Sequence, residues 1–309
     1  MQTQLRQAVV VAFGRTPYCK ARKGSFAQLH PVEYGAQTLL GVLARVPQLR
    51  PEDIGDVIMG CAMPFGVQGG NMARLIVQRA GLPDCVTAQT VNRYCSSGLQ
   101  TIATAANAIR CGEEDVVIAG GVESMSLVPM LVGAEDADPW LAEHRPEVYT
   151  TMGITAENVA RQWGISRADM DAMAVESHRR AAQAQAGGCF DGQIIPITVP
   201  GPDGGEVVVC RDEGIRPGTT AETLAGLKPC FLENGSVTAA TSSQMTDGAG
   251  FVVLMSEEKA AELGVKPLAR IVSFATGGVP AAAMGAGPIA AVPKSLRKAG
   301  RTPAQRGTL

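Results

Sequence analysis

The feature that most constrains this chain is a stretch in which one cysteine separates a strand-like run from a helix-like run. Residues 86–91 have the composition of a strand, and between residues 99 and 109 apolar side chains recur at helical spacing. Cys95 lies between the two runs and is followed by two serines, where a helix should begin. The stretch therefore predicts a strand–turn–helix unit of an α/β fold, with the Cys95 sulfur at the N-terminus of the helix.

This position suggests a chemical role for Cys95. Free N–H groups and the positive end of the helix dipole favour a thiolate at a helix N-terminus, and a thiolate is a good nucleophile for acyl groups. The competing interpretation is a buried, inert cysteine, which is the commoner case for a lone cysteine. The strand–cysteine–helix context, with Gly98 expected to permit a close backbone approach, favours the nucleophile.

Two segments together resemble a known family. Residues 91–100 read VNRYCSSGLQ and residues 116–126 read VVIAGGVESMS. They are similar to the thiolases, which are acyl-CoA:acetyl-CoA C-acyltransferases, and the resemblance extends from Val9 to about Gly300. It implies an α/β fold with α-β-α-β-α layers, mostly parallel sheets, an inserted mixed loop subdomain and an incomplete second half.

The predicted elements divide the chain in the same way. We expect residues 1–126, joined by 240–267, to form an N-terminal half, residues 127–239 to form the inserted CoA-binding subdomain, and residues 268–309 to begin a C-terminal half. The pattern predicts strands at 8–13, 56–60, 86–91, 115–120, 247–255 and 268–274, and helices at 32–43, 69–81, 155–162, 167–186 and 293–299. Ser166 and Asp169 resemble a capping box for the helix at 167–186.

Composition excludes several classes of partner. Aromatic residues make up 4% of the chain and the net charge is −2, which argues against a base-stacking surface and against a field that selects nucleic acid or anionic membrane. The eight cysteines and three histidines show no zinc-binding spacing, so we expect no metal site. Scattered cysteines and the lack of a signal peptide or membrane-spanning run indicate a cytoplasmic protein.

The resemblance also implies a site for coenzyme A. Met152, Arg216, Thr223 and Ser243 match family positions that contact the ligand, and an arginine suits stacking and bidentate contacts with adenine and phosphates. The competing interpretation for each is ordinary surface or turn chemistry. We interpret His178, which stands among charged residues in the middle of a predicted helix, as a surface histidine.

The resemblance stops before the chain would include three further family segments. Thiolases carry Asn-Glu-Ala-Phe, Gly-His-Pro and Cys-Gly-Gly segments that supply an oxyanion site, a base and a proton shuttle, and the sequence ends at Leu309 without them. One strand and one helix after residue 268 cannot bury their own apolar sides. We therefore expect a thiolase chain that lacks the C-terminal catalytic segment and shows little turnover.

These observations predict an acyltransferase that cleaves 3-oxoacyl-CoA into acetyl-CoA and a shortened acyl-CoA through an acyl-Cys95 intermediate, as in fatty-acid β-oxidation. Coenzyme A would be a co-substrate, with no permanently bound cofactor, and the family implies a homodimer or homotetramer. The alternatives are an acetoacetyl-CoA thiolase of biosynthetic direction, a related ketoacyl-synthase-like enzyme, a non-catalytic CoA- or lipid-binding protein, and a structural partner subunit. Residues 60–64 and 242–244 resemble the degradative thiolases more closely.

Overall fold

The computed structural model describes residues 5–130 and 134–302. Contacts within the chain define two compact units. Unit 1 comprises Met1–Met130, Gly188–Gly214 and Gln244–Ile271, and unit 2 comprises Leu131–Gly187, Ile215–Ser243 and Val272–Leu309. The segment 188–214 therefore packs in unit 1, while the domain boundaries expected from the sequence remain a prediction.

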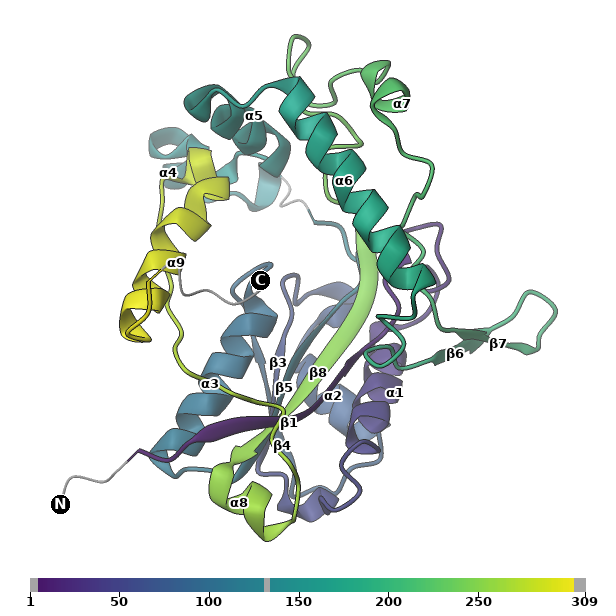
Figure 1. The fold of residues 1–309 in the computed structure, drawn as a ribbon, viewed down its shortest axis with the longest axis vertical. Helices are drawn as coiled ribbons and strands as arrows, with labels where there is room; N and C mark the ends of the chain where they lie inside the picture. Colours follow the sequence, from purple (N-terminus) through teal and green to yellow (C-terminus); the bar gives the residue numbers. More distant parts are fainter. Residues whose placement is uncertain (1–4, 131–133, 303–309) are drawn as a thin grey trace. The chain divides into compact units, whose positions relative to one another are not determined.

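Unit 1 is built around a seven-stranded sheet (Figure 1). Its strands are β1 (Ala8–Arg15), β2 (Cys19–Lys20), β3 (Asp56–Gly60), β4 (Thr87–Val91), β5 (Val116–Glu123), β8 (Thr246–Ser256) and β9 (Ala269–Arg270). The order is β4-β3-β5-β8-β1-β9, and β2 pairs with β8 beside this path. Strands β1, β3, β4 and β5 run in one direction, whereas β8 is antiparallel to both β5 and β1. The predicted α/β class with a mostly parallel sheet is confirmed.

Helices cover both faces of this sheet. The helices of unit 1 are α1 (Pro31–Leu43), α2 (Met72–Arg79), α3 (Ser97–Cys111) and α8 (Glu257–Glu262), with short 3-10 turns at Pro51–Asp53 and Gly66–Gln68. Figure 1 shows α3 on one face and α1 and α2 on the other, which gives three consecutive layers of helix, sheet and helix. A sheet covered on both faces has strands without polar alternation, which explains the fully buried run 116–119 in β5.

The side chains of β5 show how the two halves of the core are filled. Val116 and Ile118 belong to the cluster under α1 and α2, whereas Val117 and Ala119 belong to the cluster under α3. Successive side chains of a strand point to opposite faces, so one apolar run supplies both clusters. The sheet is thereby fixed between its helices, and the ends of β3, β4 and β5 are fixed with it.

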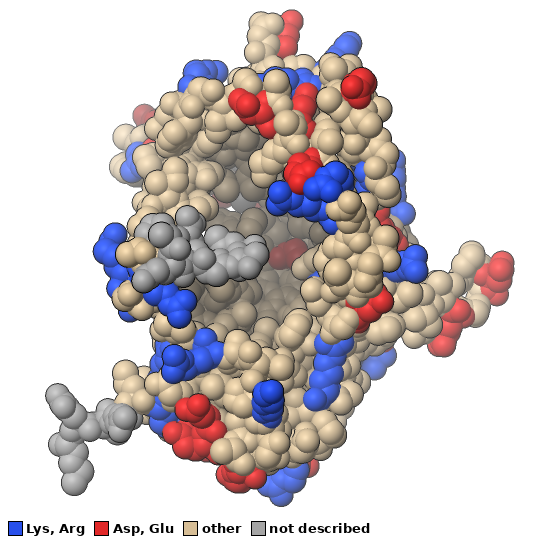
Figure 2. Space-filling view, in the orientation of Figure 1, with Lys and Arg blue, Asp and Glu red and all other residues tan. Residues whose placement is uncertain are grey.

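A short hairpin also belongs to unit 1. Strands β6 (Ile197–Pro200) and β7 (Glu206–Val209) pair antiparallel, and the buried side chains of Ile197 and Val209 join the core cluster that contains α1. Asp203 lies in the loop between the two strands and Glu206 is the first residue of β7, and Figure 2 shows acidic side chains on this hairpin. The hairpin is anchored by its base and exposes its charged end.

Unit 2 is mostly helical. Its helices are α4 (Pro139–His144), α5 (Met152–Trp163), α6 (Arg167–Ala186), α7 (Ala221–Ala225) and α9 (Gly287–Lys298), with 3-10 turns at Ala134–Asp136, Pro146–Tyr149 and Ala281–Ala286. The predicted capping box of α6 is confirmed: the Ser166 hydroxyl accepts from the Asp169 N–H, and the Asp169 carboxylate accepts from the Ser166 N–H. Among the described residues, no helix is both long and apolar enough to cross a bilayer.

Two predictions near the C-terminal end of the chain were wrong in extent. The strand expected at 268–274 is reduced to β9, in which only Ala269 and Arg270 pair with β1. The helix expected at 293–299 begins earlier, at Gly287, with Pro288 in the first turn and Pro293 inside the helix. Proline is well suited to the first turn, so Pro288 rather than Pro293 marks the start of α9.

Candidate active site at the start of helix α3

The structure places Cys95 in the turn that joins β4 to α3. The first helical residue is Ser97 and the N-cap is Ser96, so the sulfur stands two positions before the helix. Cys95 is exposed. The Ser96 hydroxyl does not cap the helix but donates to the Arg93 carbonyl at 2.9 Å. The sequence thus correctly indicated a cysteine at a helix N-terminus, and its catalytic role remains a prediction.

The residue before Cys95 has an unusual backbone conformation. Tyr94 has φ of +46°, and it is one of two non-glycine residues with positive φ in the described part of the chain. A left-handed conformation costs a bulky residue about 1–3 kcal/mol, so it persists only where the surroundings hold it. The Ser97 hydroxyl and N–H both donate to the Tyr94 carbonyl, at 2.5 and 3.0 Å. The turn at the thiol is therefore strained and held by hydrogen bonds.

A glycine of the neighbouring strand lets α3 approach the sheet. A Cβ at Gly60, the last residue of β3, would lie 2.6 Å from the Ser97 Cβ and 2.8 Å from the Gly98 nitrogen. A Cβ at Gly98 would instead meet nothing closer than the Gly120 carbonyl oxygen at 3.9 Å. The expectation that Gly98 supplies the close approach was wrong. Gly60 supplies it, because the strand lies directly against the first turn of the helix.

A half-buried carboxylate at the end of β5, that of Glu123, fixes the loop that follows Gly60. The Glu123 carboxylate accepts from the Ala62 N–H at 2.7 Å, the Met63 N–H at 3.3 Å and the Gln68 amide at 2.7 Å. Burial, with the Glu123 charge added, raises the pKa of the Cys61 thiol to about 12, so Cys61 is protonated and unreactive at neutral pH. Sequence reasoning missed Glu123, although it stands within the quoted segment 116–126.

The residues expected to contact coenzyme A lie in unit 2, whereas Cys95 lies in unit 1. Met152 is the first residue of α5 and is 41% exposed. Thr223 is in the first turn of α7, where it forms a capping box with Thr220. Arg216 and Ser243 are exposed loop residues. All four are accessible to a ligand.

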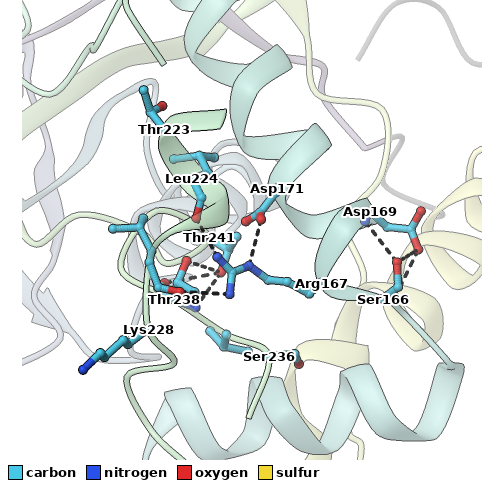
Figure 3. A network of polar contacts seen from close by, with 12 residues as sticks. Ser166, Arg167, Asp169, Asp171, Thr223, Leu224, Lys228, Ser236, Thr238 and Thr241 are labelled. Atoms are coloured by element: carbon cyan, nitrogen blue, oxygen red, sulfur yellow. Dashed lines mark hydrogen bonds and ion pairs between the residues drawn. The ribbon is translucent and has the colours of Figure 1, made fainter. Parts of the chain in front are cut away.

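Two contacts from α6 hold the segment that carries Arg216 and Thr223. The His178 Nδ1 accepts from the Arg216 backbone N–H at 3.2 Å, so His178 is a half-buried anchor rather than a free surface histidine. Arg167 donates to the Leu224 carbonyl at 2.7 Å and to the Asp171 carboxylate at 2.8 Å (Figure 3). Sequence reasoning missed both anchors, because each depends on a partner that is distant along the chain.

Within residues 5–130 and 134–302, no group of three histidine, cysteine, aspartate or glutamate side chains is placed to hold a metal ion. The site offers one exposed thiol at a helix N-terminus on an α/β sheet, beside a strained turn. This arrangement defines a class of α/β protein with a potential cysteine nucleophile.

Comparisons with known proteins identify the family. Residues 8–258 match the family model described as thiolase, N-terminal domain. The chain is 49% identical to the 3-ketoacyl-CoA thiolase of Bacillus subtilis, across 96% of this chain and 78% of that protein. It is 43% identical to the peroxisomal 3-ketoacyl-CoA thiolase A of Mus musculus, across 97% of this chain and 72% of that protein.

A solved structure agrees with these relatives. The crystal structure of the Bacillus anthracis acetyl-CoA acetyltransferase matches with a TM-score of 0.89 and 38% identity, over 97% of this chain and 78% of that chain. The chain belongs to the thiolase family, and it is an enzyme of the acyltransferase class.

Proposed function

We propose that the protein cleaves 3-oxoacyl-CoA by thiolysis, with Cys95 as the nucleophile. The Cys95 thiolate attacks the 3-oxo carbon, and the bond between carbons 2 and 3 breaks. The two-carbon fragment takes up a proton and leaves as acetyl-CoA, while the rest of the chain stays on Cys95 as a thioester. The thiol of a second coenzyme A, after losing its proton, attacks this thioester and releases the shortened acyl-CoA and the free Cys95 thiolate.

One observation carries this proposal: Cys95 is the exposed thiol that stands at the N-terminus of a helix packed on the sheet. Backbone N–H groups at such a position are donors for an anion, and the Cys95 N–H itself is a candidate donor to the tetrahedral oxyanion. The buried Cys61 is excluded because its raised pKa keeps it protonated.

The coenzyme A contacts belong to the proposal. We assign Met152, Arg216, Thr223 and Ser243 to the ligand because all four are exposed and match family positions. His178 anchors the Arg216 backbone, and in the described part of the chain the Arg216 guanidinium forms no ion pair. A guanidinium on a held backbone is suited to phosphate or adenine.

The degradative direction rests on relatives named 3-ketoacyl-CoA thiolase, two of which are peroxisomal. The second candidate is acetyl-CoA condensation, which the relatives named acetyl-CoA acetyltransferase favour. A cytoplasmic location and a homodimer or homotetramer remain predictions.

The test reads the first half-reaction, since it requires only the nucleophile and the substrate. The full chain is incubated with a 3-oxoacyl-CoA in the absence of free coenzyme A, and the adduct is located by intact mass and peptide mapping. We expect an acyl group on Cys95 that is lost on adding coenzyme A. The proposal fails if Cys95→Ser retains the adduct. The matched control is Cys111→Ser, which changes the exposed cysteine at the other end of α3 and should leave the adduct unchanged.

A further inference from the structure

One side chain links the strained turn before Cys95 to the neighbouring strand–loop junction. The Asn92 Oδ1 accepts from the Tyr94 backbone N–H at 2.8 Å, and the Asn92 Nδ2 donates to the Ala62 carbonyl at 3.1 Å. Only one orientation of the amide satisfies both partners, because an N–H needs an acceptor and a carbonyl needs a donor. Asn92 therefore bridges two loops with both ends of its amide group.

Ala62 is a rigid anchor for this bridge. Its N–H donates to the half-buried Glu123 carboxylate at 2.7 Å, and the adjacent Cys61 N–H donates to the Val91 carbonyl at 3.1 Å. The parallel pairing of β3 with β4 places this junction beside the end of β4. The contacts form a continuous path from Glu123 at the end of β5, through Ala62 and Asn92, to Tyr94.

Tyr94 needs such support because of its left-handed backbone. Ser97 holds the carbonyl of Tyr94, and Asn92 holds its N–H, so the peptide groups on both sides of the φ +46° residue are engaged. The Tyr94 side chain is 66% exposed and contributes little packing of its own. Without the Asn92 contact, the energetic preference of an aromatic residue would return Tyr94 towards negative φ and would move Cys95.

We propose that Asn92 is a positioning residue for Cys95: it holds Tyr94 in the left-handed conformation and so sets the place of the sulfur at the start of α3. The inference deepens the proposed function, on which its acyl-transfer part rests. An asparagine is suited to the task because it offers an acceptor and a donor at once. Aspartate would keep the acceptor for Tyr94 and would face the Ala62 carbonyl with a second acceptor.

The test compares Asn92→Ala, Asn92→Asp and a matched control in the full chain. Asn71 is the control because it is also exposed and also bridges, donating to the Ala88 carbonyl at 2.8 Å and accepting from the Arg74 N–H at 3.3 Å. Two rates are measured at Cys95: alkylation by iodoacetamide, and acylation by acetoacetyl-CoA over a range of concentrations.

We expect Asn92→Ala to lower the limiting acylation rate about tenfold or more, with the half-saturating concentration little changed, because misplacing a reacting group costs rate rather than binding. Asn92→Asp should fall between Asn92→Ala and the parent protein. Asn71→Ala should lower the melting temperature and leave both Cys95 rates unchanged.

A rescue experiment separates positioning from a general loss of structure. Glycine adopts positive φ without a steric penalty, so Tyr94→Gly should make the Asn92 contact less necessary. The acylation rate of the double variant Asn92→Ala/Tyr94→Gly should therefore be at least half that of Tyr94→Gly alone. A general loss of stability would not be repaired by glycine at position 94, because glycine also raises the conformational entropy of the unfolded chain.

Each outcome decides between the proposals. If iodoacetamide alkylates Cys95 in the parent protein but acetoacetyl-CoA never acylates it, the proposed function fails. The alkylation rates of the variants then test the positioning role of Asn92 on their own. Parent-like rates in Asn92→Ala, or a loss of rate that Tyr94→Gly does not restore, would overturn the positioning role. If Asn92→Ala does not fold, the rates of Asn92→Asp decide the question in the same way.

Discussion

The two ends of helix α3 carry the same residue type in the same state of exposure. Cys95 precedes the first turn and Cys111 is the last helical residue, and both thiols are exposed. The surroundings differ. The first end follows a strained turn held by side chains, whereas the second closes with Gly112 at φ +78°, whose N–H donates to carbonyls of the last turn.

The comparison shows that neither exposure nor residue type selects a nucleophile. The helix dipole favours negative charge at the first end and opposes it at the second. The first end is also fixed to the sheet through Gly60 and to the neighbouring loop through Asn92. Cys111 at the second end has neither the favourable dipole nor this fixation. The position along one helix therefore distinguishes a candidate catalytic thiol from an ordinary one.

The largest expected effect comes from filling the space between the sheet and the first end of α3. Gly60→Ala should lower the free energy of unfolding by about 1–3 kcal/mol, because the new Cβ would overlap Ser97. Chemical denaturation measures the loss. Gly98→Ala is the control, and it should be neutral or stabilising by up to about 1 kcal/mol, since its Cβ has room and alanine favours a helix. Equal losses in both variants would contradict the assignment of the close approach to Gly60.

The next effect is a difference in rate between the two thiols. Cys95 should be alkylated about tenfold faster than Cys111 at low ionic strength, because the dipole contributes with opposite sign at the two ends. Competition labelling with iodoacetamide, read peptide by peptide, gives the ratio in one sample. Added salt should reduce the ratio, and a ratio near one at low salt would remove the electrostatic part of the comparison.

A smaller effect is expected at the second end of α3, which closes at Gly112. Gly112→Ala should cost about 1 kcal/mol, because an L-residue is strained at the φ of +78° that ends α3. Thermal unfolding measures it. The control is Gly226→Ala at the end of α7, where the cap residue has φ of −77° and alanine carries no such penalty. A Gly112→Ala variant that also slowed Cys95 alkylation would show that the two ends of α3 are coupled.

The smallest effect concerns the ion pair between Arg6 and Asp115, which follows the second end of α3 in the sequence. The Arg6 guanidinium hydrogen-bonds to Asp115 and holds the pKa of that carboxyl below its usual value. A lowered pKa in the folded state means that the stabilisation is present above the unfolded value of about 3.9 and is lost as the pH falls through the folded pKa.

Asp115→Asn should therefore cost about 0.5 kcal/mol or less at neutral pH, since the Asp115 side chain is 57% exposed. The stability of the variant and that of the parent protein should converge in acid. Asp84→Asn is the control, because Asp84 is 93% exposed and lies 3.6 Å from its partner Arg74. A difference that persists in acid would assign the effect to something other than the charge of Asp115.

Local signals were sufficient for much of the fold. The capping box at Ser166 and Asp169 fixed the start of α6, and the serines after Cys95 correctly indicated the start of α3, since both depend on residues a few positions apart. Pro293 misled the prediction of α9, because proline is favoured in the first turn of a helix and disfavoured in its interior. In this helix Pro288 occupies the first turn and Pro293 lies inside.

The features that sequence reasoning missed depend on distant pairing. Asn92 stands within the quoted motif, yet its role requires the Ala62 carbonyl, which β3 brings beside it. Gly60 was not distinguished from Gly98 for the same reason, because only the packing of α3 on the sheet shows which glycine is crowded. The periodicity of apolar residues predicts helices and strands, whereas the register of paired strands decides which side chains from distant segments contact each other.

The position of β8 has a consequence for the time course of synthesis. The strand fills the gap between β5 and β1, and it is encoded after the whole of segment 124–245. A ribosome needs on the order of 10 s to synthesise this segment. For that period β1 and β5 each present an open edge to the cell, and such edges pair readily with foreign strands. A nascent chain stalled before Thr246 should therefore engage chaperones strongly, and one released after Ser256 should not.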